Sequence, residues 1–108
     1  IHSMSVERLA QLKAMLAEEP GDLFLRYAIA LELKREGNME QAISDLETML
    51  HEHPDHIASY YQLAIMLADL GRTDDAIAVC KAGSLRCLVT GDRKARAELM
   101  ELQNGLEE

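Results

Sequence analysis

The sequence is poor in helix-breaking residues and in large aromatic side chains. Its 108 residues include two prolines, six glycines, no tryptophan and only four aromatic residues. Leucine and alanine dominate the apolar set, and β-branched residues are few, which favours helix over strand. A chain this short forms a single domain and has little room for an elaborate catalytic cavity.

Cysteine is equally scarce, because Cys80 and Cys87 are the only two. Two cysteines are too few for a disulfide scaffold. Seven residues of helix separate them by about 10 Å, which is too far for a disulfide bond. We therefore expect two small packing residues in a reducing compartment, with a redox pair as the alternative.

The chain has no apolar run of about 18 residues, the length that would span a membrane. Its N-terminus also lacks the basic-then-apolar pattern of a secretory signal. Residues 1–3 do not resemble a natural start, whereas Met4 does, so we interpret 1–3 as a vector remnant and 4–108 as the domain. No membrane partner is expected, and the default location is the cytoplasm.

Positive charge is in deficit, with 11 Lys and Arg against 19 Asp and Glu and a net charge of −8. Nucleic-acid binding needs clustered cations, so DNA or RNA is not expected as a partner. Residues 23–56 alone carry a net charge of −4. We interpret this excess as a solubility surface, with steering of a basic partner as the functional alternative.

Catalytic signatures are also missing. The sequence contains no nucleophile elbow, no phosphate-binding loop and no paired CxxC motif. Nothing in it meets the requirements for a nucleophile, a base and an orienting group. We predict no catalytic residues and no cofactor, and the protein is not expected to be an enzyme.

What the chain does contain is an internal repeat with a period of 34 residues. A shift by that period superposes Tyr27 on Tyr61, Ala30 on Ala64, Gly37 on Gly71, Ala42 on Ala76 and Ile43 on Ile77. Repeats of this period indicate stacked supersecondary units. The chain then divides into a half repeat (5–20), a first repeat (23–56), a second repeat (57–90) and a closing helix (91–106).

Each repeat is predicted to form two helices. Residues 23–36 contain neither proline nor glycine, and Gly37 is placed to end that helix. Asn38 is expected to cap the next helix in a capping box with Gln41. Asp55 is expected to cap the helix after that.

The segment 84–92 has two interpretations. Thr90-Gly91-Asp92 resembles a break between two helices, and the alternative is one long helix through Gly91. With the break, the prediction is an all-α protein of about six helices.

This organisation resembles the tetratricopeptide repeat (TPR) family, whose 34-residue units are helical hairpins with small residues where the two helices approach closely. The first repeat matches the family pattern at Ile29, Ala30, Leu33, Gly37, Ala42, Leu46 and Pro54. The second matches at Tyr60, Leu63, Ala64, Leu67, Gly71, Ala76, Cys80 and Gly83. The resemblance implies a right-handed α-α superhelix, a solenoid that acts as a scaffold for protein–protein interaction.

Three residues depart from the family pattern. Arg26 replaces a large apolar residue, Met49 replaces a small one, and Leu88 stands where the second repeat would close with proline. The loss of that proline suggests that the array ends there, with 91–106 as a capping helix over the last apolar face.

The resemblance also implies a partner-binding groove along the first helix of each repeat. It would bind a protein partner's peptide or helix through Phe24, Tyr27, Leu31, Tyr61 and Ile65, with Lys34, Arg35 and Asp69 at its edges. The Lys and Asn pattern that binds chaperone C-termini is absent. Two alternatives are packing of these residues against neighbouring helices and burial of the same apolar stripe in a homodimer.

A third, weaker alternative is a metal site. His51, His53 and His56 surround Pro54, and three imidazoles could bind zinc or nickel. They straddle a helix end and a turn, so helical spacing does not bring them together. Solvent-exposed turn histidines are the simpler interpretation.

Overall fold

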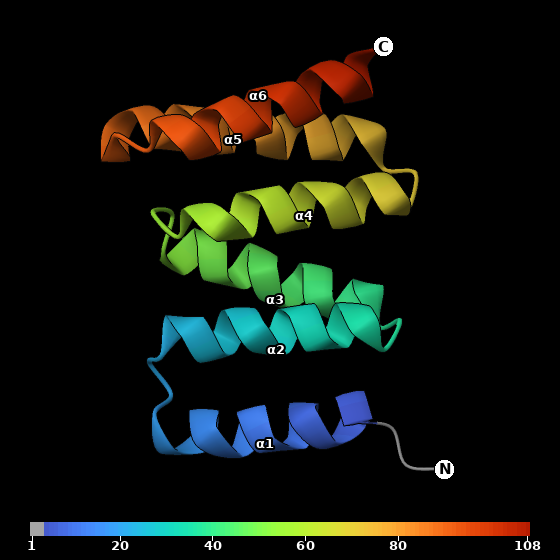
Figure 1. The fold of residues 1–108 in the computed structure, drawn as a ribbon, viewed down its shortest axis with the longest axis vertical. Coiled ribbons are helices and arrows are strands. Elements are labelled where there is room, and N and C mark those ends of the chain that lie inside the picture. Colours follow the sequence, from blue (N-terminus) through green and yellow to red (C-terminus); the bar gives the residue numbers. More distant parts are fainter. Residues whose placement is uncertain (1–3) are drawn as a thin grey trace. The chain divides into compact units, whose positions relative to one another are not determined.

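The computed structural model describes residues 4–108 and, within them, contains α-helices and no strand (Figure 1). The helices are α1 (Met4–Glu18), α2 (Leu23–Arg35), α3 (Met39–Glu52), α4 (Ile57–Asp69), α5 (Thr73–Thr90) and α6 (Arg93–Glu107). The prediction of an all-α chain with six helices is confirmed. The proposed vector remnant, residues 1–3, lies outside the described residues.

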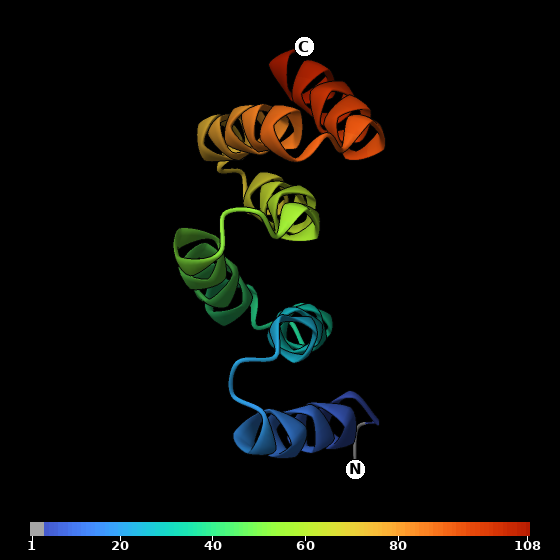
Figure 2. The same ribbon diagram turned by 90° about the vertical axis from the view of Figure 1, so that its left-hand side faces the viewer.

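The chain folds as two compact units, the first ending at Met49 and the second running from Leu50 to Glu108. In the first unit α1 packs against α2, and α2 turns directly into α3 (Figure 1). In the second unit α5 packs against both α4 and α6, and α4 also contacts α6 (Figure 2). None of the helices in residues 4–108 is long and apolar enough to cross a membrane.

Local signals set the ends of α2. The Asp22 carboxylate accepts a hydrogen bond from the backbone N–H of Leu25 at 3.0 Å, which satisfies one of the free donors at the helix start. At the other end Gly37 has a φ of 83°, a left-handed conformation that glycine adopts without strain. The N–H of Asn38 then donates to the carbonyl of Leu33, and this bond closes the turn.

Asn38 directly precedes α3, where the predicted cap would stand, but the predicted capping box and the predicted Asp55 cap are wrong. The side chain of Gln41 donates to Asp45 one turn ahead instead of reaching back to Asn38, so no capping box forms. The N-terminal cap of α4 is His56 and not Asp55. The reason is tertiary, because the Asp55 carboxylate is bound by the guanidinium of Arg86 from α5.

The uncertain segment 84–92 contains a helix break at Gly91. α5 continues to Thr90, and Gly91 follows with a φ of 78° while its N–H donates to the carbonyl of Cys87. The Asp92 carboxylate then accepts from the N–H of Ala95 at 3.1 Å and starts α6. The alternative of one long helix is therefore wrong.

The alanines expected at the helix crossings are completely buried. Ala30 and Ala42 in the first unit are 0% exposed, and so are Ala64 and Ala76 in the second. A side chain this small lets two helix backbones approach closely. The small residues that the sequence pattern singled out are therefore core positions in both units.

The core of the second unit is built around Tyr60, Cys87 and Leu99. Cys80 and Cys87 are both buried and unbonded, as the sequence spacing predicted. Burial raises the pKa of both thiols, which keeps them protonated and unreactive. They are packing residues of α5.

Candidate partner-binding surface

The predicted side chains of α2 lie outside the core of the first unit. Phe24 is 70% exposed. Tyr27, Leu31 and Lys34 are partly buried, and Arg35 is exposed. The core of this helix is formed by the residues between them, Leu25, Ile29 and Leu33. The α2 stripe, defined as Phe24, Tyr27, Leu31 and Lys34, thus presents an aromatic and apolar surface with a cation at one end.

Arg35 has a partner that the sequence analysis did not identify. Its Nη1 atom lies 2.8 Å from the Oε1 atom of Glu32 one turn earlier, and the Nε atom of Arg8 from α1 lies 3.1 Å from the same oxygen. The Glu32 side chain is 4% exposed, so its charge needs this compensation. These residues line a cavity of about 450 Å³ between α1 and α2. Arg8 therefore ties α1 to α2 through Glu32, and Arg35 pairs with the same carboxylate from within α2, at the edge of the α2 stripe.

The predicted residues of α4 are divided between the core and the surface. Tyr61 is partly buried and packs on the Tyr60 cluster. Ile65 is partly buried, and Asp69 is exposed. Tyr61 also lines a cleft of about 390 Å³, which it shares with α6. Its ring therefore belongs partly to the protein core and partly to an open surface.

The rest of this α4–α6 cleft was missing from the sequence prediction. It consists of Glu98, Glu101, Leu102, Gly105 and Leu106. Their spacing of three and four residues puts them on one face of α6. This spacing was visible in the sequence, but only the contact between α4 and α6 shows that Tyr61 completes the surface.

The histidines do not form a metal site. His51 and His53 are exposed, and the Nδ1 atom of His56 lies 2.8 Å from the Ser59 hydroxyl, with which it shares a hydrogen bond. Residues 4–108 contain no group of three His, Cys, Asp or Glu side chains able to hold a metal ion. Burial lowers the pKa of His56. The metal interpretation of these three residues is therefore wrong.

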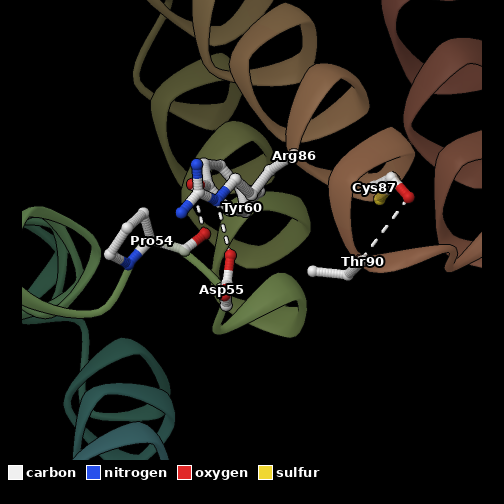
Figure 3. A network of polar contacts seen from close by, with 6 residues as sticks. All are labelled: Pro54, Asp55, Tyr60, Arg86, Cys87 and Thr90. Carbon is white, nitrogen blue, oxygen red and sulfur yellow. Dashed lines mark hydrogen bonds and ion pairs between the residues drawn. The ribbon is translucent and has the colours of Figure 1, made fainter.

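A polar network connects the α3–α4 turn to α5 (Figure 3). The Tyr60 hydroxyl donates to the carbonyl of Pro54 at 2.6 Å, and Arg86 pairs with Asp55. Burial raises the pKa of Tyr60, so its hydroxyl stays a donor. Pro54 closes the first repeat, and this network holds the closing turn against the second hairpin.

A second open surface of this unit lies on α5. Leu85, Leu88 and Val89 are 66%, 60% and 71% exposed. Their spacing puts all three on one face of the helix. Leu88 and Cys87 also line a cavity of about 700 Å³ that runs along α6. The sequence analysis did not assign this face to any function.

These helical hairpins, with buried small residues and a glycine turn between the two helices of each, define a helical repeat protein. A sequence model of the tetratricopeptide repeat matches residues 33–86. A tetratricopeptide repeat domain protein from Salinibacter ruber, solved by NMR, is 33% identical and has a TM-score of 0.78, over 82% of this chain and 89% of that one. The chain belongs to the tetratricopeptide repeat family.

Two further structures are similar. A crystal structure of a tetratricopeptide repeat domain protein from the same organism is 32% identical, with a TM-score of 0.75, over 80% of this chain and 97% of that one. The TPR2B domain of yeast Sti1, solved in complex with pHsp70, has a TM-score of 0.85 at 14% identity, over 95% of this chain and 82% of that one. Among proteins of curated function, none matches significantly. The family fold generally serves protein–protein interaction.

Proposed function

We propose that the protein is a non-catalytic interaction module that binds a peptide or helix of a partner protein. The binding surface of the first unit is the α2 stripe, and Tyr61 and Ile65 of α4 are the corresponding side chains of the second unit. The observation that carries this proposal is Phe24, an aromatic side chain that is 70% exposed beside other apolar residues of one helix face. Aromatic anchors of this kind contribute much of the affinity in protein interfaces.

The mechanism is passive. Rigid helices hold the aromatic and apolar side chains in place before the partner arrives, so binding loses little conformational entropy. Two buried cysteines without a disulfide support a cytoplasmic location, where thiols stay reduced.

The test is affinity capture from a lysate of the source organism with the wild type and with Phe24→Ala. Because Phe24 is exposed, its removal should leave the fold intact while weakening a centrally placed contact by about 2 kcal/mol. The matched control is Met15→Ala, which removes another exposed apolar side chain of the first unit, one that lies outside the stripe. We expect the captured protein to be lost only with Phe24→Ala, and equal capture by all three chains would contradict the proposal.

A second candidate function is self-association, and α5 provides the observation that favours it. Leu85, Leu88 and Val89 form an exposed apolar face on one helix, and such a face is often buried against a partner. In a twofold dimer the same face would pack on itself. Light scattering across a range of concentrations should then show a dimer that Leu88→Glu dissociates. A monomer at every concentration would exclude this function.

A further inference from the structure

A cavity of about 700 Å³ lies between the C-terminal end of α5 and one face of α6. Two arginines, Arg93 and Arg96, line this α5–α6 cavity together with the apolar side chains of Leu88 and Met100. Leu88 is 60% exposed and Met100 is 40% exposed, so both apolar side chains are accessible to a partner. An apolar cavity with a few convergent polar groups is typical of a binding site.

The two arginines of the α5–α6 cavity form no ion pair with any residue that the structure describes. Elsewhere in the chain, four arginines each pair with a carboxylate, namely Arg8, Arg35, Arg72 and Arg86. Asp92 and Glu101 line the same cavity but pair with neither arginine. The Asp92 carboxylate accepts instead from the backbone N–H of Ala95. Both guanidinium groups are therefore without a carboxylate partner within residues 4–108.

Arg96 provides the observation that points to an occupant. Its Nε atom is shielded from solvent and has no hydrogen-bond acceptor among the described residues. Buried donors without an acceptor are rare and unfavourable, and those of charged groups are the most unfavourable. A carboxylate can accept from the Nε–H and from an Nη–H of one guanidinium at the same time. An acidic group in the cavity would therefore supply the acceptor that the chain does not.

The position of the cations on α6 favours a single negative charge. Arg93, Lys94 and Arg96 lie in the first turns of the helix, where the helix dipole is positive and disfavours cations. A bound anion would reduce this repulsion. Glu101 lies about 12 Å further along the helix, and it would repel a second negative charge. The cavity therefore suits one carboxylate better than a doubly charged phosphate group.

We propose that the α5–α6 cavity is a second docking site of the module, and that it binds a partner segment in which an acidic residue adjoins an apolar one. The carboxylate lies between the guanidinium groups of Arg93 and Arg96, and the Arg96 side chain turns toward the cavity to donate its Nε–H. The apolar neighbour packs on Leu88 and Met100. This site belongs to the second unit, so it goes beyond the surface proposed for α2.

The test is an array of short synthetic peptides probed with the labelled protein. Each peptide contains a single glutamate beside leucine, and matched peptides carry glutamine or lysine in place of the glutamate. We expect the glutamate peptides to bind, the glutamine peptides to bind about tenfold more weakly and the lysine peptides not to bind. The affinity of the tightest glutamate peptide is then measured by fluorescence anisotropy.

Two double variants with the same change in charge separate the cavity from the overall charge of the chain. Arg93→Gln/Arg96→Gln removes both guanidinium groups and should weaken binding of the glutamate peptide about tenfold. Lys81→Gln/Lys94→Gln removes two exposed cations that do not line the cavity, and should keep the affinity within about threefold of the wild type. Phe24→Ala should bind this peptide like the wild type, because Phe24 belongs to the first unit.

Arg96→Met separates binding from folding. Methionine keeps an unbranched apolar stem but has no N–H, so the variant removes the unsatisfied donor. Its Tm should equal or exceed that of the wild type, while its affinity for the glutamate peptide should fall about tenfold. A lower Tm would show that the guanidinium stabilises the fold of the free chain, and it would overturn the proposal.

The remaining outcomes are equally decisive. Glutamine peptides that bind as tightly as glutamate peptides would overturn the proposal, and so would equal affinities of the two double variants. An array without a bound glutamate peptide, or a glutamate peptide that Phe24→Ala no longer binds, would also overturn it. None of these results decides the function of the α2 stripe, which the capture experiment with Phe24→Ala tests separately.

Discussion

Gly83 of α5 lies directly against the ring of Tyr60 of α4: a β-carbon at Gly83 would be 2.8 Å from both Cβ and Cγ of Tyr60. This contact sets how closely the two helices of the second hairpin approach. It also makes the two helical glycines of the second unit opposite cases, because Gly105 has no neighbour at that distance.

Alanine at these two positions should change stability in opposite directions. Gly83→Ala forces apart a packed contact and should lower the free energy of unfolding by about 1–3 kcal/mol despite the better helix propensity. At Gly105 an added methyl group meets no neighbouring atom. Gly105→Ala therefore improves the helix propensity without a clash, and it should raise the free energy of unfolding by up to about 1 kcal/mol. Urea unfolding measures both. Equal effects of the two substitutions would show that Gly83 is not packed as described.

Removal of the Tyr60 hydroxyl should loosen the α3–α4 turn. Tyr60→Phe leaves the ring in the core but takes the donor from the Pro54 carbonyl, and we predict a loss of about 1 kcal/mol in unfolding free energy. Tyr61→Phe is the matched control in the next residue and should stay within about 0.5 kcal/mol of the wild type. A loss with Tyr61→Phe as large as that with Tyr60→Phe would exclude a specific role for the hydrogen bond.

Stability should fall on mild acidification because of His56. Burial lowers its pKa in the folded chain, and the nearby charge of His53 acts in the same direction. The unfolded chain therefore binds a proton first, below about pH 6.5, and protonation there favours unfolding. The contribution of the neutral His56 side chain to the free energy of unfolding is complete above about pH 6.5. It is lost as the pH falls below that value.

His56→Asn tests this directly. Asparagine is a good residue for a helix N-terminus and does not titrate, so the variant should lose less stability than the wild type between about pH 8 and about pH 5.5. The exposed His51→Asn should follow the wild-type curve. Parallel curves of unfolding free energy against pH for the wild type and His56→Asn would show that His56 does not cause the loss of stability.

The two arginines on Glu32 should act cooperatively. Arg8→Gln or Arg35→Gln alone leaves one guanidinium on the buried carboxylate and should cost less than about 1 kcal/mol. Together they remove the ion pairs of Glu32 with Arg8 and with Arg35, and the double variant should cost more than the sum of the single ones. Thermal unfolding of the four chains measures the coupling, and strict additivity would contradict it.

The helix ends were predictable wherever the signal is local. Gly37 and Gly91 end helices because they adopt a left-handed conformation that depends only on the adjacent turn. The cap assigned to Asp55 failed because its partner, Arg86, is 31 residues away in sequence. An ion pair of that kind exists only once α5 has packed on the preceding turn.

For the candidate surface, too, the sequence predicted the residues that share one helix but not those that two helices bring together. The family resemblance implied that Phe24 and Tyr27 lie on the surface, and the structure leaves both partly or largely accessible. It did not identify Glu98 or Gly105, because the α4–α6 cleft depends on how α6 packs against α4. Periodicity within one helix says which residues share a face but not which other helix that face meets.

The most direct test of the account is to map a bound peptide residue by residue. In an NMR titration with the partner segment that the wild type captures, we predict chemical-shift changes at the backbone amides of the α2 stripe. The amides of Leu85, Leu88 and Val89 should not shift. Changes confined to those three residues of α5, or no saturable change, would contradict the account.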